Sequence, residues 1–398
     1  MFGRHKKLRT PPITSSELSD DTGLSQLGSD EHLPTLHQRT LIQRILRDDK
    51  NLKYFFILLG LIIATGVGLI VMLSLHHEPT ISDKIVVPKP KEIPKFYSPL
   101  TGADTTEEAT KRPITAIMIE NSPEARPQSG LKQGGVIYEA IAEGGITRFV
   151  VLYQESRPQL IGPVRSVRPY YVEWASAYDP AVAHVGGSQR ALSMIRGGNY
   201  GLDMDQFFNA STYWRSTDRV APHNVYTSFD KLDTLRTAKG KTSSTFESSP
   251  RKDELTPAKI TAAREKGTVA ANSLSLDISS GQFHVEYAYQ VDTNTYKRSQ
   301  GGVEHLDRED GLIAPKVVVA IKVPMSIEME DGYREQITTT GSGQAYVFQD
   351  GTVIEGRWKR DGEKSRLILT DADGKEIALN RGQTWITAVP DNKGVTWQ

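Results

Sequence analysis

Hydrophobic residues are spread unevenly along the chain, and one stretch stands apart from the rest. Residues 54–75 (YFFILLGLIIATGVGLIVMLSL) contain no charged side chain. A helix of about 20 residues crosses a hydrocarbon core of roughly 30 Å and satisfies its own backbone hydrogen bonds. The pattern therefore predicts one transmembrane helix over 54–75 and a single-pass integral membrane protein.

Charges beside this segment predict its orientation. On its C-terminal side the nearest lysine is Lys84, whereas basic residues crowd the N-terminal side at Arg39, Arg44, Arg47, Lys50 and Lys53. Positive charge stays in the cytoplasm, so we expect the N-terminus inside and the rest of the chain outside. A cleaved signal peptide is the alternative, but the length of the run and the tail before it favour a signal anchor.

Within the apolar run, Gly60, Ala64 and Gly68 follow one another at steps of four residues. Small residues at this spacing let two transmembrane helices approach closely. The stripe predicts a homodimer through these three residues.

The segments on either side of the apolar run are polar. We expect residues 1–53 to form a mostly disordered cytoplasmic tail, because residues 1–35 are rich in Ser, Thr, Asp and Pro. Residues 36–50 fit either an amphipathic helix at the membrane surface or an extension of the transmembrane helix. Prolines recur in residues 76–111, which predicts an extended spacer.

Residues 112–241 show alternating strand and helix patterns, which predict a first domain of α/β or α+β class. Strands are expected over 114–120, 136–143, 146–154 and 181–185, with the second and third joined by a Gly144-Gly145 hairpin turn. Helices are expected from Pro169, after Ser188 and after Ser228, where the two serines are suitable N-caps.

Residues 242–272 are polar and predict a linker or long loop, with a short helix over 257–265. From 273 to 398, Val, Ile, Tyr and Thr alternate with polar residues between Asp-Gly turns such as Asp350-Gly351. This pattern predicts a smaller second domain that is mostly antiparallel β.

Composition excludes several functional classes. The 48 basic and 48 acidic residues give zero formal charge, which argues against a nucleic-acid partner because such proteins need a basic excess. There is no cysteine, so disulfides, thiolate metal sites and cysteine nucleophiles are excluded. Spacings typical of metal sites are also missing from the sequence, and we expect no metal and no other cofactor.

The hairpin carries the charged residues of greatest interest. A simple register sets Glu143 opposite Ile146, Ile141 opposite Arg148 and Glu139 opposite Val150. Glu139, Glu143 and Arg148 would then share one face of the sheet. Such a cluster is either a structural ion pair or part of a site.

Four arginines, Arg126, Arg148, Arg165 and Arg168, occupy loops or lie just after a turn. Arginine captures carboxylate or phosphate with two hydrogen bonds, which suits an anionic ligand. The alternative is that these arginines bond main-chain carbonyls of the long loops.

Three further positions are candidates. Ser188 opens a helix after a Gly-Gly turn, where backbone N–H groups attract anions, although N-capping alone is the simpler role. His184 and His223 lie in a strand and in the loop RVAPHNVYT. A histidine in a strand is more often a hydrogen-bonded core residue than a catalyst.

The runs RPITAIMIENSPEARPQSGLKQGGVIYEAIAEGGITRFVVLYQ, IGPVRSVRPYYVEWASAYDPAVAHVGGS and APHNVYT, and the later GSGQAYVFQDGTVIEGRW, resemble the YerB-like lipoprotein family of bacteria. The resemblance implies an extracytoplasmic protein with an α/β domain and a smaller β domain, of unassigned biochemical function. This chain lacks the lipid-bearing cysteine, so the transmembrane helix replaces the lipid anchor. Residues that match the family's phrases are Arg126, Pro127, Gln128, Ser129, Gly130, Glu139, Glu143, Gly144, Gly145, Arg148, Gly162, Arg165, Arg168, His184, Gly186, Gly187, His223 and Asn224.

Two functional hypotheses follow. The first is a protein of the bacterial cell membrane whose extracytoplasmic part binds a cell-wall component or an envelope protein through an Arg/Glu-rich face. The second is a cell-wall hydrolase or transglycosylase with Glu139 or Glu143 as general acid. Residues i and i+4 of one strand lie roughly 13 Å apart, too far for two cooperating carboxyl groups, so the enzyme ranks below the binding protein. The candidate ligand-binding residues are Arg126, Gln128, Ser129, Glu139, Glu143, Arg148, Arg165, Arg168, His184, Ser188, His223 and Asn224.

Overall fold

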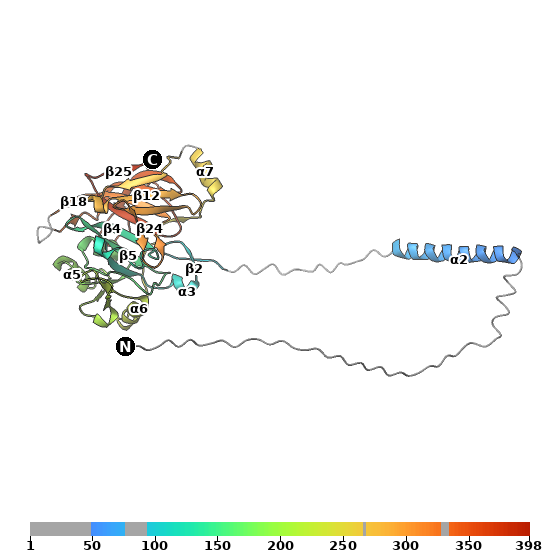
Figure 1. Ribbon diagram of the computed structural model, residues 1–398, viewed down its shortest axis with the longest axis horizontal. Helices are drawn as coiled ribbons and strands as arrows, with labels where there is room; N and C mark the ends of the chain where they lie inside the picture. Colours follow the sequence, from blue (N-terminus) through green and yellow to red (C-terminus); the bar gives the residue numbers. More distant parts are fainter. Residues whose placement is uncertain (1–48, 76–93, 266–267, 328–333) are drawn as a thin grey trace, which may run out of the picture. The chain divides into compact units, whose positions relative to one another are not determined.

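The computed structural model describes residues 49–75, 94–265, 268–327 and 334–398 (Figure 1). The tail before residue 49, with most of the segment expected to be amphipathic, lies outside the described residues, as do positions 76–93 of the proline-rich spacer. The chain divides into two compact units, Met1–Lys91 and Glu92–Gln398.

The first unit contains helix α2 (Asp49–Leu75). Its segment Leu52–Leu75 is long and apolar enough to cross a membrane. A helix is therefore found where the apolar run predicted one. A Cβ added at Gly60 or Gly68 would meet no atom within 4 Å. Dimerisation through the stripe of Gly60, Ala64 and Gly68 stays a prediction.

The second unit is built around a ten-stranded mixed sheet. Its strands are β3 (Thr115–Glu120), β4 (Val136–Glu143), β5 (Ile146–Tyr153), β6 (Ala181–His184), β7 (Leu202–Asp205), β17 (Val317–Val323), β20 (Gly341–Gln349), β21 (Thr352–Arg360), β22 (Ile368–Thr370) and β24 (Thr384–Pro390). Their order is β22-β21-β20-β17-β24-β4-β5-β3-β6-β7. The four strands expected in the first domain are confirmed as β3 to β6.

Helices cover both faces of this sheet. Helices α4 (Pro169–Ser176) and α5 (Gln189–Arg196) contribute to the apolar core on one face, hereafter the α4 face. Helix α6 (Phe229–Ala238) contributes to the core on the opposite face, hereafter the α6 face. The predicted N-caps are confirmed, because the hydroxyls of Ser188 and Ser228 each accept a hydrogen bond from a main-chain N–H of the following helix.

A second sheet packs on the α6 face of the large sheet, over β17 and β20. It consists of β11 (Ser273–Leu276), β12 (Val285–Gln290), β13 (Thr295–Gln300), β14 (Val303–Glu304) and β25 (Val395–Trp397), all antiparallel, in the order β14-β13-β12-β11-β25. Its inner residues, such as Tyr287, share a core with Val318 and Phe348 of the large sheet. Figure 1 shows this β-rich layer in yellow and orange, with β25 in red. The mixed α/β class with a smaller β-rich part is confirmed.

The large sheet contains strands from both halves of the second unit. Strand β24 pairs in parallel with β4, with Thr384 beside Val136 and Thr387 beside Glu139. Since β24 also pairs with β17, residues 317–390 and residues 115–205 form one continuous sheet. Parallel pairing between such distant segments leaves no mark in the local sequence pattern.

Two segments predicted as spacer and linker contact the folded unit. Strands β1 (Phe96–Tyr97) and β2 (Asp104–Thr105) and helix α3 (Glu107–Thr110) begin it before the expected position 112, and Leu100 is buried. Strand β10 (Arg251–Lys252) pairs with β23 (Leu379–Asn380), and helix α7 (Pro257–Glu265) lies where a helix was expected. The spacer and the linker were predicted from their polar composition. The residues that contact the folded unit are too few to change that composition.

The remaining short elements connect these layers. They are strands β8 (Trp214–Arg215), β9 (Val225–Tyr226), β15 (Leu306–Asp307), β16 (Gly311–Leu312), β18 (Met325–Ser326) and β19 (Gln336–Ile337), and the 3-10 turns Pro123–Ala125, Ala210–Thr212 and Gly281–Phe283.

The predicted hairpin register is wrong beyond the turn. Glu143 lies opposite Ile146 as expected, but the register then shifts between Ile141 and Glu143, so that Arg148 lies opposite Ala140 and Glu139 opposite Phe149. A β-bulge adds one residue to one strand and reverses the side chains beyond it. Glu143 and Arg148 therefore face the α4 side, and Glu139 faces the α6 side.

Candidate functional site

Several parallel strands end at one edge of the large sheet. Strands β3, β6 and β7 pair in parallel, and they end at Glu120, His184 and Asp205. Binding sites of α/β sheets lie at the carboxyl ends of parallel strands, where loops from different strands meet. We call this end of the sheet, with the loops that follow the three strands, the carboxyl edge.

Glu120 is the centre of one polar cluster at the carboxyl edge. Its Oε1 accepts hydrogen bonds from Arg165 Nε at 3.1 Å, from Ser122 Oγ at 3.2 Å and from His223 Nδ1 at 3.0 Å. Glu120 is buried and its Oε2 has no hydrogen-bond partner, whereas Arg165 retains 26% side-chain exposure. Sequence reasoning missed Glu120; its only signal was its place as the last residue of a buried strand before a turn-rich loop.

Ser122, His223 and Glu120 do not form a proton relay. Ser122 Oγ lies 3.1 Å from His223 Nδ1, and Glu120 contacts the same ring nitrogen. A Ser-His-acid triad needs the hydroxyl and the carboxylate on opposite nitrogens of the imidazole. The cluster is therefore suited to holding a polar group and not to activating a serine.

Glu143 forms a second cluster, between two buried arginines on the α4 face. Arg148 Nη2 lies 2.7 Å from Glu143 Oε1, and Arg168 donates to Oε2 through Nε at 3.0 Å and Nη2 at 2.7 Å. Burial by itself would raise the pKa of Glu143, but the charges and hydrogen bonds of both arginines lower it below its usual range. Two guanidinium groups on one carboxylate leave one positive charge uncompensated within the cluster.

His184 and Ser188 order the Gly-Gly turn that follows β6. His184 is buried, with Nδ1 2.8 Å from the carbonyl oxygen of Gly186 and Nε2 3.0 Å from Asp203 Oδ1. Both partners accept hydrogen bonds only, so both ring nitrogens face acceptors. Ser188 caps α5 directly after the turn. These two candidates therefore stabilise the turn that follows β6 at the carboxyl edge.

Glu139 lies on the opposite face of the sheet. Its Oε2 accepts from Arg298 Nη2 at 2.7 Å and from Trp385 Nε1 at 3.0 Å, and all three side chains are buried. Gln128 joins the same interior network through His305. This network connects the two sheets, and Glu139, Gln128 and His305 themselves are buried away from a ligand.

The remaining candidates are separate from both edge clusters. Arg126 bonds Asn121 and lies 5.1 Å from the ring of Phe283 in the β-rich layer. Ser129 is fully buried. Asn224 bonds Arg215 and the main chain of Ser216, which holds the β8–β9 hairpin together. The four arginines thus do not share one partner: Arg148 and Arg168 hold Glu143, Arg165 holds Glu120, and Arg126 turns toward the α6 face.

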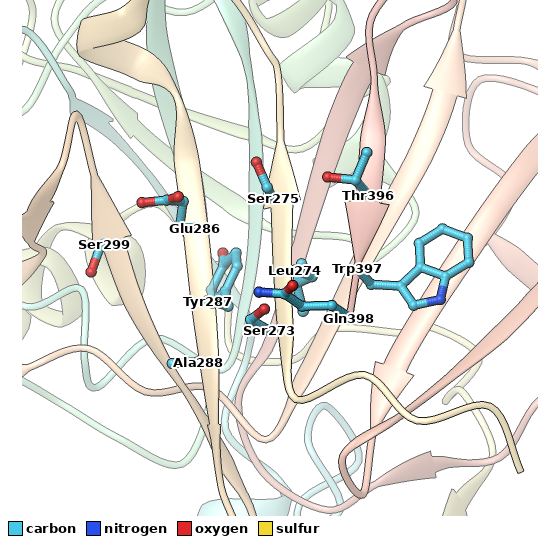
Figure 2. A pocket seen from close by; sticks show the side chains of 10 residues that line it. All are labelled: Ser273, Leu274, Ser275, Glu286, Tyr287, Ala288, Ser299, Thr396, Trp397 and Gln398. Carbon is cyan, nitrogen blue, oxygen red and sulfur yellow. The ribbon is translucent and has the colours of Figure 1, made fainter.

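A separate hollow of about 570 Å³ lies on the five-stranded sheet. Figure 2 shows its lining side chains, which come from β11, β12, β13 and β25 and from the following Gln398. Glu286 is the charged residue among them. The hollow is remote in sequence from the arginine clusters and contributes no residue to them.

Metal ligation finds no support in the part of the chain that the structure describes. Within those ranges, no group of three or more His, Cys, Asp or Glu side chains is placed to hold a metal ion.

Comparison with known proteins gives matches in both halves of the second unit. Residues 100–243 match the family described as "Protein of unknown function (DUF3048) N-terminal domain", and residues 274–386 match its C-terminal domain. The "Putative lipoprotein YerB" of Bacillus subtilis (strain 168) is 34% identical over 307 residues, which cover 76% of this chain and 88% of the relative. The crystal structure of YerB protein from Bacillus subtilis is similar with a TM-score of 0.67 and 31% identity, covering 76% of this chain and 100% of that one.

Proposed function

Because the chain belongs to the DUF3048 family, whose relative YerB is named as a lipoprotein, we propose that it is a membrane-anchored, extracytoplasmic protein that binds a cell-wall component through the carboxyl edge. The family itself has no assigned activity. The proposal therefore depends on the residues of this chain.

Helix α2 supports the location. A lipoprotein is attached by a lipid on cysteine, and this chain has no cysteine. Helix α2 supplies an apolar segment of sufficient length in the corresponding N-terminal position. Lys50 and Lys53, near the N-terminal end of this helix, favour a cytoplasmic N-terminus.

The observation that carries the proposal is the convergence of polar side chains at an edge that faces away from the point where the chain enters the fold. Leu100 and Thr101 lie against Gly135, directly before β4. Glu143 and Glu120 lie at the other ends of β4 and the parallel strand β3, roughly 20 Å away at 3.3 Å per residue. The polar side chains therefore lie at the end of the sheet opposite to the point where the chain enters the fold.

The chemistry of the edge suits a ligand with anionic or hydrogen-bonding groups. Arg165 is the partly exposed arginine of the Glu120 cluster, and the nearby Glu143 cluster has an excess of one positive charge. Arginine recognises carboxylate and phosphate through paired hydrogen bonds. Its pairing with Glu120 fixes the guanidinium in place before a ligand arrives.

The hydrolase hypothesis loses its two candidate acids. Glu139 is fully buried and ion-paired with Arg298. The pKa of Glu143 is lowered by its two arginines despite burial, whereas a general acid needs a raised pKa and access to its substrate. The two carboxylates also face opposite sides of the sheet, so they cannot flank one bond.

Photo-crosslinking in living cells tests the proposal. Val220 is 82% exposed in the β8–β9 hairpin, next to Arg219, which bonds the loop after β3, whereas Val303 is 64% exposed on the five-stranded sheet. A benzophenone amino acid at 220 should form a high-mass adduct that muramidase releases, and the same group at 303 should not. No adduct at 220, or equal adducts at both positions, would contradict the proposal.

A further inference from the structure

A second hollow, of about 190 Å³, lies beside α4, next to the Glu143 cluster but distinct from it. Its walls come from the first two turns of α4, from residues 336–340 and from Glu363, and Arg190 of α5 also lines it. Drug-sized ligands occupy pockets of roughly 300–1,000 Å³. This hollow therefore suits one ring-sized unit of a larger molecule.

One buried arginine holds the three walls together. Arg360 is 1% exposed, and its guanidinium donates to the main-chain carbonyl oxygens of Glu173, Thr339, Glu363 and Ser365. A single side chain thereby fixes the helix, the strand segment and the loop relative to one another. The hollow is built into the fold before any ligand binds.

Glu173 is the buried acid of this hollow. It is 6% exposed, and its carboxylate accepts a hydrogen bond from Thr339 Oγ1 and lies 3.7 Å from Arg190 Nη2. Burial raises the pKa of Glu173, and the negative charge of Glu363 adds to this effect. A desolvated carboxyl group that lines a concave surface is a frequent sign of a functional site.

The lining offers donors, acceptors and an apolar floor in a small space. Glu173 and Glu363 supply acceptors, Arg190 supplies donors, and Pro169 and Tyr170 supply apolar surface. Because Arg190 and Arg360 balance the two carboxylates, an ion would gain little net attraction here. A neutral ring with several hydroxyl groups on one side and C–H groups on the other matches all of these features.

We infer that this hollow is a binding subsite for one sugar ring of a cell-envelope glycan, with Glu173 and Glu363 accepting hydrogen bonds from its hydroxyl groups. The subsite does not depend on Arg165 or Glu120. Sugar binding at this subsite can therefore be tested separately from ligand binding at the carboxyl edge.

Calorimetric titration of the full-length protein in phospholipid nanodiscs tests the inference. The probes are the N-acetylglucosamine tetramer, glucose and galactose, with spermidine as a cationic probe. We expect at least one sugar to bind the wild type, and Glu173→Gln to weaken that sugar at least tenfold through loss of a charge-assisted hydrogen bond. Absence of heat with all three sugars, or binding of spermidine alone, would overturn the assignment.

Matched variants separate the subsite from general effects on folding. Glu155→Gln removes a carboxylate that also accepts from hydroxyl groups, those of Ser98 and Thr101, and should leave sugar binding unchanged. If Glu173→Gln fails to fold, Glu363→Gln, at a less buried position, must show the tenfold loss; unchanged affinity in a folded variant of either residue would contradict the inference.

Discussion

Arg298 Nη2 lies 2.7 Å from Glu139 Oε2, and both side chains are fully buried between the five-stranded sheet and the ten-stranded sheet. The guanidinium of Arg298 also lies 4.5 Å from the ring of Trp385. The pair joins β13 to β4 and β24, which come from the two segments that match the family. Burying a charge is costly unless its partner is present.

Replacing Arg298 should therefore destabilise the whole second unit. We expect Arg298→Met to lower the free energy of unfolding by about 3–5 kcal/mol, because Glu139 is left charged and buried. The double variant Glu139→Gln/Arg298→Met should lose less unfolding free energy than Arg298→Met, because no unpaired charge stays buried. Denaturant unfolding followed by circular dichroism measures this, and Lys297→Met, at the more exposed neighbour that pairs with Glu304, is the control. A separate early transition confined to the β-rich layer would show that the sheets unfold independently.

The Glu143 cluster predicts a pH dependence. Two arginines lower the folded-state pKa of Glu143 below the usual 4.5, so its ionised form stabilises the fold above the unfolded-state pKa. That stabilisation disappears as the pH falls through the folded-state pKa. The difference in unfolding free energy between wild type and Glu143→Gln should be largest near neutral pH and should narrow below about pH 4. A difference that stays unchanged as the pH falls well below 4 would mean that the ion pairs contribute nothing to stability.

Topology is testable in spheroplasts. The flanking lysines predict that the chain after His76 lies outside the cytoplasm. Protease added to intact spheroplasts should remove an epitope fused after Gln398 and spare one fused before Met1. Protection of the C-terminal epitope until the membrane is lysed would contradict both the orientation and the proposed function.

Local patterns predicted the strands and caps of the first domain, because each depends on neighbours in sequence. Alternation and apolar runs identified β3 to β6, and serines placed before helical segments identified the caps of α5 and α6. The bulge near Ala142 was missed, since its effect is set by pairing geometry and not by residue type. One added residue was enough to move Glu139 to the other face and to separate it from Glu143.

The candidate site was only partly predictable for a related reason. The arginines could be identified as candidates from their residue type and their positions in the sequence. Their partners, however, depend on which strands become neighbours. Glu120 meets His223, and Glu173 meets Thr339, across more than a hundred positions of sequence. Such contacts exist only once the sheet has assembled, so Glu120 and Glu173 resembled ordinary residues of a strand and a helix.

The affinity of the full-length protein for purified cell-wall sacculi tests directly whether the carboxyl edge binds a cell-wall component. Co-sedimentation should give a dissociation constant for the wild type that weakens as salt is added, and Arg165→Ala should weaken binding by about 1–3 kcal/mol. Arg381→Ala is the matched control, because Arg381 is an equally exposed, ion-paired arginine that bonds Gly102 where the chain enters the fold. We expect loss of affinity in Arg165→Ala with an unchanged melting temperature, and wild-type affinity in Arg381→Ala. Equal affinity of all three proteins, or no binding by any of them, would contradict it.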